Sequence, residues 1–377
     1  MFPHVTSMER EYDLLDYTWY YRSKVLLNVV PPILILIGTV GNSLSFLVLM
    51  RCTMRNVGAY NYLAALSVAD TLVLYIGLLR MWIGQMTGYD VKNESDVACK
   101  VINVVNYTVS DYSVWLLIAV TVERYIVTVH ALHSKSMCTK SRARIAMLAI
   151  FNLLLLVDSH FLFTTELQHM SGPLDSECNG AEGFQVLAEK IWPWVDAAIY
   201  SFVPFIVIIT LNVRIICQVS RAVKRRQGLL HVTDSYESAL PLKTSSNSAS
   251  VRHSASENST RITVMLLTIS FTFLLTTLPM NVTMIVTSFA ASDASMEQAV
   301  KFKFARTVTE LLMYTNHSVN FFLYLLTGHK FRQQLSAMFR VRRRPLSRSY
   351  SDAEKTNQTE LNTLKAPPLS RVTYTHG

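Results

Sequence analysis

Seven mainly apolar stretches recur along the chain, and shorter polar segments separate them. A helix rises about 1.5 Å per residue and the hydrocarbon core of a bilayer is roughly 30 Å thick, so each stretch is long enough to cross a membrane. The pattern predicts an all-α fold, a bundle of seven transmembrane helices. The predicted spans are residues 26–50, 59–83, 97–127, 143–165, 192–219, 261–290 and 303–327.

Two of these spans are too polar to face lipid on all sides. The third contains Asn103, Asn106 and Asp111, and the seventh contains Glu310, Asn316, His317 and Asn320. Polar side chains within a membrane are costly unless they face the interior of a bundle. We therefore expect the third and seventh spans to lie inside it.

The segments outside the spans complete the predicted organisation. After the last span, Phe331, Leu335 and Phe339 recur at helical spacing among basic residues, which is typical of a short amphipathic helix on the membrane surface. Residues 227–260 are rich in Ser, Thr and Asn, which predicts a mobile loop. The predicted divisions are an extracellular N-terminus (1–25), the bundle (26–327), the amphipathic cytoplasmic helix (328–340) and a disordered cytoplasmic tail (341–377).

Composition and charge agree with a membrane protein. Half of the residues are hydrophobic and 16% are charged, which is too apolar for a soluble domain of this length. The net charge of +9 comes from bases between the spans and in the tail, so the charge indicates contact with membrane lipid and not with nucleic acid. The positive-inside rule predicts an extracellular N-terminus, and the localisation expected is the plasma membrane.

Polar residues and prolines stand at particular depths in six of the spans. In chain order they are Gly41-Asn42, Leu66-Ser67-Val68-Ala69-Asp70, Glu123-Arg124-Tyr125, Phe202-Val203-Pro204-Phe205, Phe273 with Thr276-Thr277-Leu278-Pro279, and Asn320-Phe321-Phe322-Leu323-Tyr324. Together they resemble the rhodopsin-like G-protein-coupled receptors across residues 25–340. The resemblance implies a receptor that activates a heterotrimeric G protein.

Several positions depart from the family pattern. Thr277 stands where the family usually has Trp, Phe321 where it has Pro, and Asn212 where it has Tyr, and the fourth span lacks its usual Trp. The endings of the sixth and seventh spans are similar to those of invertebrate neuropeptide receptors of the FMRFamide and myosuppressin type. The residues that match the activation hinge of the family are Pro204, Phe273, Thr277 and Pro279.

The resemblance assigns roles to further residues. It implies a disulfide between Cys99 and Cys178, the alternative being two free thiols, and coupling to the G protein through Glu123, Arg124 and Tyr125. It also implies a sodium ion held by Asp70, Ser113, Asn316 and Asn320, within a polar core that includes Asn42 and Tyr324. The alternative to the ion is a protonated Asp70 that is hydrogen-bonded within the bundle. No other cofactor is expected.

The predicted outer loops are strongly acidic, which favours a cationic ligand. Asp196 and Glu310 are the carboxylates best placed to bind a guanidinium group, so we expect a small basic peptide, amidated in the FMRFamide manner. The other residues assigned to the ligand pocket are Arg80, Asn106, Asn281 and Tyr314. The alternative is that Arg80 and Glu310 form a structural ion pair and that the ligand is apolar.

Other functions are less well supported. A photoreceptor would need Lys where Tyr314 stands, and an amine receptor would need Asp where Asn106 stands. No internal repeat indicates a transporter, and no nucleophile or metal set indicates an enzyme. A receptor for a non-peptide small molecule remains the main alternative.

Two modifications are expected. Asn93 begins a glycosylation sequon in an outer loop. Hydroxyl residues of the tail are candidate sites for receptor kinases, and their phosphorylation would recruit arrestin. These residues are Ser347, Ser349, Ser351, Thr356, Thr359 and Thr363.

Overall fold

The computed structural model describes residues 18–51, 58–130, 134, 136–169, 176–237, 246–290 and 295–339. The chain divides into two units, Met1–Gln334 and Leu335–Gly377. In the second unit only the end of the last helix is described, so the predicted tail and the six candidate phosphorylation sites lie outside the described residues. The predicted all-α architecture is confirmed.

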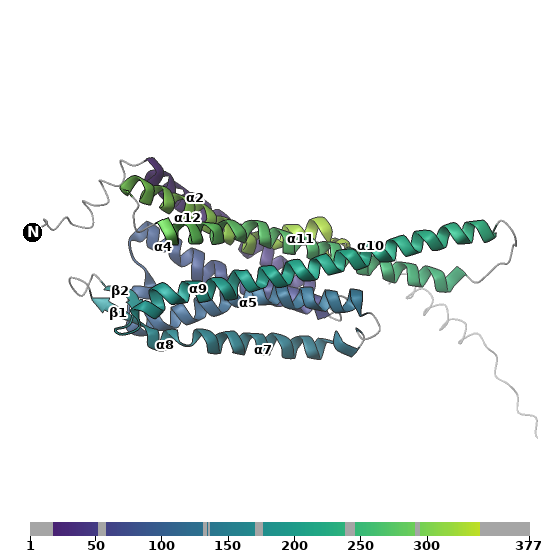
Figure 1. Cartoon of the computed structure of the whole chain (residues 1–377), viewed down its shortest axis with the longest axis horizontal. Coiled ribbons are helices and arrows are strands. Elements are labelled where there is room, and N and C mark those ends of the chain that lie inside the picture. Colours follow the sequence, from purple (N-terminus) through teal and green to yellow (C-terminus); the bar gives the residue numbers. More distant parts are fainter. Residues whose placement is uncertain are drawn as a thin grey trace, which may run out of the picture. The chain divides into compact units, whose positions relative to one another are not determined.

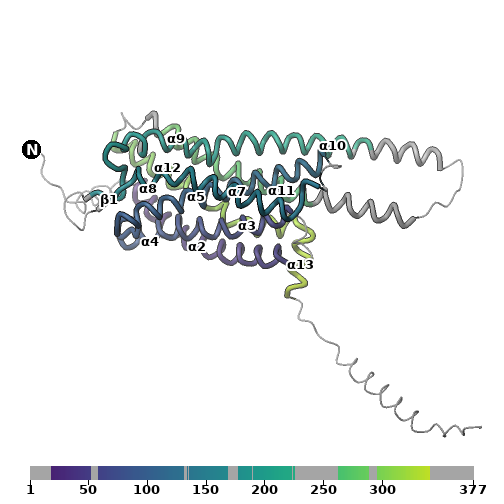
Figure 2. Tube along the Cα trace, turned by 90° about the horizontal axis from the view of Figure 1, so that it is seen from below, coloured from purple at the N-terminus to yellow at the C-terminus, as the bar shows by residue number. Residues whose placement is uncertain are grey.

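The first unit is a bundle of long helices that run side by side (Figures 1 and 2). Helix α5 lies inside this bundle and contacts α3, α7, α10 and α11, whereas α12 packs against α2 and α11. The helices are α2 (Thr18–Leu49), α3 (Gly58–Val73), α4 (Arg80–Thr87), α5 (Asp96–Val129), α7 (Lys140–Asp158), α8 (Phe161–Thr164), α9 (Trp192–Ala197), α10 (Val203–Glu237), α11 (Ser246–Ala290), α12 (Met296–Thr327) and α13 (His329–Phe339).

The surface of the bundle suits lipid. Leu36, Leu156, Leu275 and Leu326 are 67%, 71%, 72% and 73% exposed although they are fully apolar. Six helical segments within the described residues are long and apolar enough to cross a membrane. The seventh, α12, is 32 residues long but is more polar. Several of its polar side chains are buried, among them Asn316, His317, Ser318 and Asn320.

The connection between the fourth and fifth spans contains a short hairpin that the sequence did not predict. Strands β1 (Thr165–His169) and β2 (Ser176–Gly180) pair antiparallel, with Leu167 opposite Cys178. Two helices also extend into residues 227–260, because α10 ends only at Glu237 and α11 begins at Ser246. The prediction of a mobile loop is therefore wrong at both ends of that segment. Once a helix exists, each added residue forms a bond without a new nucleation cost.

Three π-helical segments interrupt the α-helices. They are η1 (Leu74–Leu79) between α3 and α4, η3 (Val186–Ile191) before α9, and η4 (Ala198–Phe202) between α9 and α10. Segment η4 ends two residues before Pro204, which has no N–H to donate and whose ring crowds the carbonyl four residues earlier. The wider turn accommodates this defect without breaking the helix.

Helix α13 begins directly after α12. Phe331 is buried and its ring lies 5.9 Å from that of Phe321 and 5.5 Å from that of Tyr324. The Arg332 guanidinium donates to the carbonyls of Leu325 and Leu326, at 2.9 and 2.6 Å. These carbonyls are among the last of α12 and lack helical partners, so Arg332 caps that helix.

Candidate functional site

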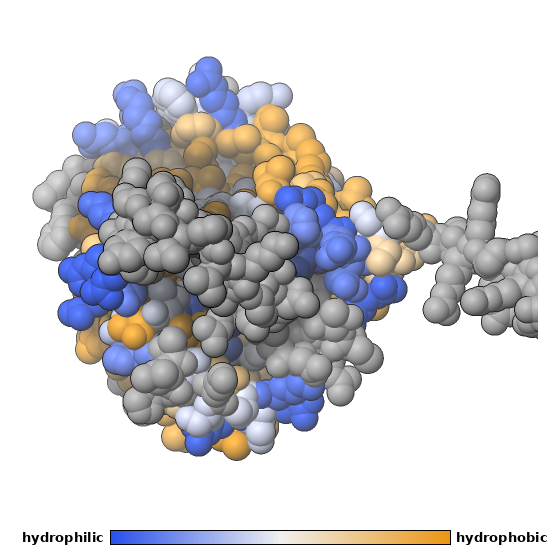
Figure 3. Space-filling model, turned by 90° about the vertical axis from the view of Figure 1, so that its right-hand side faces the viewer, coloured by the Kyte–Doolittle hydropathy of each residue, from blue (hydrophilic) through white to orange (hydrophobic). Residues whose placement is uncertain are grey.

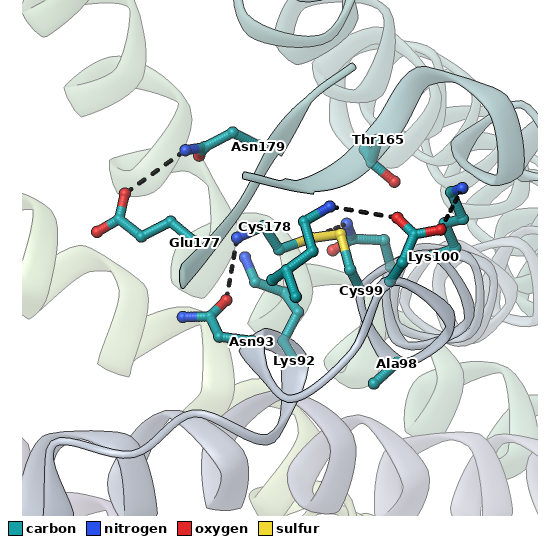
Figure 4. Close-up of a disulfide and its surroundings, with 12 residues drawn as sticks. Lys92, Asn93, Ala98, Cys99, Lys100, Thr165, Glu177, Cys178 and Asn179 are labelled. Carbon is teal, nitrogen blue, oxygen red and sulfur yellow. Dashed lines mark hydrogen bonds and ion pairs between the residues drawn. A yellow bond between two sulfur atoms is a disulfide. The ribbon is translucent and has the colours of Figure 1, made fainter. Parts of the chain in front are cut away.

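A disulfide joins the first turn of α5 to the hairpin. Cys99 and Cys178 are bonded, with their Cα atoms 5.5 Å apart (Figure 4). The predicted pairing is confirmed. This end of the bundle, where β1 and β2 lie in Figure 1, is called the disulfide end below. Cys138 and Cys217 are free thiols, and Cys52 lies outside the described residues.

Two hydrogen bonds reinforce the disulfide. The backbone N–H of Leu167 donates to Asp96 Oδ1 at 3.2 Å, and that of Cys178 donates to Asn93 Oδ1 at 3.1 Å. Figure 4 shows the amide nitrogen of Asn93 pointing away from Cys178. N-linked glycans are attached at the side-chain nitrogen of Asn. A glycan on Asn93 would therefore leave the hydrogen bond to Cys178 in place. Glycosylation of Asn93 stays a prediction.

The charged residues of the loop after α4 are paired locally. The Arg80 guanidinium donates to Asp90 Oδ2 at 2.5 Å, and Asp90 Oδ1 accepts the N–H of Lys92 at 2.9 Å. Burial, with the positive charge of Arg80 nearby, lowers the pKa of Lys92. Arg80 therefore forms its ion pair with Asp90, although its positive charge also acts on Glu310. The reason is that the long side chain of Arg80 extends toward the loop after α4, where Asp90 lies ten residues later in the sequence.

Three carboxylates gather between α5, α7 and α9. Asp111, Asp158 and Asp196 are close enough for their charges to repel one another. Asp158 accepts a hydrogen bond from Thr108 at 2.9 Å, but its second oxygen and both oxygens of Asp111 have no hydrogen-bond partner in the described structure. Asp111 is 1% exposed and Asp158 is 0% exposed. We call these three residues the carboxylate cluster.

An aromatic group lies beside the carboxylate cluster. The ring of Tyr107 stacks on Phe161 at 4.6 Å and meets Trp192 edge-on at 6.2 Å. Tyr107 also interacts electrostatically with Asp196, Asp111 and Asp158, and with Arg306 of α12. Aromatic walls beside unpaired carboxylates are suited to cations that carry an apolar stem.

The remaining residues assigned to the pocket are spread over several helices. Asn281 on α11 donates to the Ser201 hydroxyl of η4, which ties two helices together. Tyr314 is buried against η1, and any side chain at Gly77 would strike its hydroxyl. Asn106 and Glu310 are half-buried on α5 and α12. The structure thus brings Asp196 to the carboxylate cluster, whereas Asn281 and Tyr314 make contacts between helices.

A polar core surrounds Asp70 in the middle of the bundle. Asp70 Oδ1 accepts the Ser113 hydroxyl at 2.7 Å and His317 Nδ1 lies 2.8 Å from the same oxygen. Asp70 Oδ2 accepts the amide of Asn320 at 2.7 Å. The Asn42 amide donates to the backbone carbonyl of His317 at 3.0 Å, so four helices meet here.

The polar core does not fit a sodium ion in this arrangement. A hard cation needs oxygen lone pairs that point at it, but Ser113 and Asn320 point their protons at Asp70 and His317 supplies a nitrogen. The adjoining cavity, lined by Ser113, Asn316 and Asn320 among others, measures about 10 Å³, which is about the space one water needs. Tyr324 is buried nearer α13, with its hydroxyl unpartnered among the described residues.

The four hinge residues lie on α10 and α11. Phe273 is fully buried, and its ring meets Phe205 edge-on at 5.6 Å. Thr277, one turn further along α11, is buried with a hydroxyl that has no partner in the described part of the chain. Pro279 stands inside α11 and Pro204 follows η4. Backbone defects therefore flank the Phe205–Phe273 contact on both helices.

The opposite end of the bundle contains Glu123 and Arg124, and we call it the arginine end. Glu123 Oε1 accepts the N–H of Ala59 at 3.0 Å and the guanidinium of Arg124 at 3.2 Å. Both side chains are buried, and Tyr125 beside them makes an edge-on contact with His130. A Cβ at Gly58 would lie 2.7 Å from Glu123 Oε1, so only glycine admits the carboxylate to the first turn of α3.

The sequence did not single out four of these residues. Asp158 lies within an apolar span, as does Tyr200, whose hydroxyl lies 3.4 Å from His317 Nε2, and only their depth marks them. Gly58 gives no signal without its partner Glu123. His317 offered one, because it stands three residues before Asn320 and shares its face of the helix. No group of three His, Cys, Asp or Glu side chains suited to a metal occurs within the described residues.

The buried carboxylate Asp70, the Glu123–Arg124 pair and the disulfide all fall within one family match. The sequence model of the family described as the 7 transmembrane receptor (rhodopsin family) matches residues 41–324. The chain belongs to the rhodopsin family of receptors. It is therefore a multi-pass membrane protein of the plasma membrane and not an enzyme, and family membership implies an extracellular ligand and coupling to a G protein.

Several receptors of known name are similar to this rhodopsin-family chain. The growth hormone secretagogue receptor type 1 of Rattus norvegicus is 25% identical over 307 residues, which cover 79% of this chain and 76% of the relative. The C-C chemokine receptor type 8 of Homo sapiens is 23% identical over 329 residues, which cover 84% and 80%.

Proposed function

We propose that this receptor binds an extracellular peptide that carries a positive charge, and that it activates a heterotrimeric G protein through its arginine end. The disulfide end and the N-terminus then lie outside the cell. An oxidising exterior favours the disulfide at that end. The excess of Lys and Arg in the connections at the other end supports the same orientation.

The carboxylate cluster is the main observation that supports a cationic ligand. A buried carboxylate without a basic partner costs several kcal/mol, because the group loses its hydration. Both oxygens of Asp111 and one oxygen of Asp158 are buried without a hydrogen-bond partner in the described structure, and Asp196 lies beside them. A guanidinium or ammonium group from a ligand would remove that cost and would bind two carboxylates at once. Asp196 is half-buried and is the member that a ligand meets first.

A peptide is favoured over a small molecule by the relatives. Two of them are named for secretagogue and chemokine recognition. The amidated, FMRFamide-like character of the ligand rests on the endings of the sixth and seventh spans, where Thr277 and Phe321 replace the usual Trp and Pro. The hairpin tethered by Cys99–Cys178 adds a backbone edge at the same end, which an extended peptide can use.

The arginine end suits the coupling role. Arg124 is held by Glu123 and is buried, so it is withheld from a partner in this conformation. Figure 3 faces this end and shows hydrophilic side chains around its rim, with hydrophobic ones on the flanks. Release of the pair would free the guanidinium for a helix of the G protein. Receptor kinases and arrestin would act on the tail that follows.

The experiment is a peptide screen in cells that co-express the receptor with a promiscuous Gα subunit. Amidated peptides with a terminal Arg are compared with matched peptides in which citrulline replaces Arg, because citrulline keeps the shape and loses the charge. We expect calcium responses to the Arg peptides, and responses about tenfold or more weaker to the citrulline peptides.

Cells without the receptor control for responses that do not pass through this protein, and the Arg124→Ala receptor, at matched surface expression, tests coupling through the arginine end. Equal potency of the Arg and citrulline peptides would contradict the cationic ligand. Activation by non-peptide compounds alone would favour the small-molecule alternative. A response that survives in the Arg124→Ala receptor would contradict coupling through the arginine end.

A further inference from the structure

Three groups of the chain itself donate to the carboxylate of Asp70, which has about four acceptor sites. Its side chain is 0% exposed, as is that of His317. One oxygen receives the Ser113 hydroxyl and the Nδ1 of His317, and the other receives the Asn320 amide. Three helices, α3, α5 and α12, are joined through this one group. An ion at Asp70 would have to share the carboxylate with these three donors.

The imidazole of His317 is held at both of its nitrogens. Nδ1 lies 2.8 Å from Asp70 Oδ1, so it carries the proton of that hydrogen bond, because the carboxylate is an acceptor. Nε2 lies 3.4 Å from the hydroxyl of Tyr200, which projects from the π-helical segment η4. The Asn42 amide fixes the backbone of the same residue at 3.0 Å. The ring cannot turn away without loss of these contacts.

The surroundings leave little space for an ion with its water. Sodium would need about five or six oxygen ligands, as hard cations do. The adjoining cavity of about 10 Å³ has room for about one water. The oxygens Asn42 Oδ1 and Asn320 Oδ1 are neutral amide groups without a hydrogen-bond partner among the described residues, and a water in this cavity could donate to them.

We propose that His317 takes the place of the sodium ion that the resemblance implied at Asp70, so that this receptor is insensitive to sodium. The hydrogen-bonding partner of Asp70 is then part of the chain, and it is present at every salt concentration. Through Tyr200 the same ring links η4 to α3 and α12. The inference concerns the polar core alone and does not depend on the ligand or on the proposed function.

The test measures the thermal unfolding of the purified receptor in lipid nanodiscs, with sodium chloride replaced stepwise by choline chloride at constant ionic strength. We expect the Tm of the wild type to be the same in both salts. His317→Ser removes the imidazole and leaves a hydroxyl, so its Tm should rise with sodium by on the order of 2 to 4 °C and then saturate. Asp70→Asn added to His317→Ser should abolish that rise.

Tyr200→Phe is the matched control, because it removes the hydroxyl beside Nε2 and leaves His317 against Asp70. Its Tm should stay independent of sodium. If His317→Ser does not fold, His317→Asn serves as the second opening variant. A saturable rise of the wild-type Tm specific to sodium would overturn the proposal. So would sodium independence in every His317 variant, since the imidazole would then not be what excludes the ion.

Discussion

Gly58→Ala is the change that tests the resting lock at the arginine end most directly. The added Cβ would lie 2.7 and 2.8 Å from the two carboxylate oxygens of Glu123. A contact this short forces a shift, and the flexible end of Glu123 is the part that gives way. The carboxylate then loses two hydrogen bonds of the wild type, the one from the backbone N–H of Ala59 at 3.0 Å and the one from the guanidinium of Arg124 at 3.2 Å. We therefore expect the variant to signal without ligand.

The size of the effect follows from the bonds lost. A hydrogen bond to a charged group contributes about 1.5 to 3 kcal/mol. If only the resting state contains this bond, the ratio of active to resting receptor rises by about one to two orders of magnitude, at about 1.4 kcal/mol per factor of ten. Alanine is also the better helix former, by up to about 1 kcal/mol. That gain stabilises α3 in both states, so it does not oppose the shift.

The assay is ligand-free nucleotide exchange on the G protein, measured at equal surface expression. Gly84→Ala is the matched control, because its Cβ would meet no atom closer than 3.7 Å. Glu123→Gln should raise basal activity as well, and the double variant should add little to either single change, since both act on one contact. Basal exchange in Gly58→Ala equal to that of the wild type and of Gly84→Ala would refute the reasoning.

Three further outcomes are expected. Cys99→Ser and Cys178→Ser should lower surface expression or ligand affinity to the same extent, with the double variant no worse, and additive losses in a cell-surface binding assay would contradict a shared bond. Arg124→Ala should keep ligand affinity within about threefold but abolish nucleotide exchange, and normal exchange would remove its assigned role. Asp196→Asn should raise the concentration of cationic peptide needed for half response about tenfold or more. Glu310→Gln should do the same if Glu310 also binds the ligand, and an unchanged potency in both would remove the two carboxylates from the binding site.

The helical bundle was predictable because membrane spans depend on length and apolar composition, which are local properties of the sequence. The predicted spans agree with the observed helical segments except near their ends. The fourth is interrupted at Ser159 and His160, between α7 and α8, and its last residue, Thr165, begins β1. Helix α2 begins at Thr18, eight residues before the predicted first span. The hairpin of β1 and β2 was missed because five residues per strand carry little periodicity. Its stability comes from Cys99–Cys178 and from the contacts of Asp96 and Asn93, which are distant in sequence.

The candidate site was predictable where a motif marks depth and was not where a partner lies on another helix. Asp70 stands out in an apolar span, but its contact with His317 depends on how α3 and α12 are rotated about their axes. Arg80 likewise suggested a partner at its own depth, Glu310. The structure pairs it with Asp90 in the adjoining loop, because a long side chain near a helix end reaches back toward the surface.

The position of Tyr200 shows why an α-helical pattern drawn on the fifth span is insufficient. A π turn holds more residues than an α turn, so side chains beyond it are rotated by up to roughly 100° relative to an unbroken α-helix. Tyr200 lies within η4, between Asp196 of the carboxylate cluster and Pro204. The proline is visible in the sequence, but the extent of the π segment is not. Because of that segment, Tyr200, which an α-helical wheel of this apolar span does not mark as functional, reaches His317 and contacts the polar core.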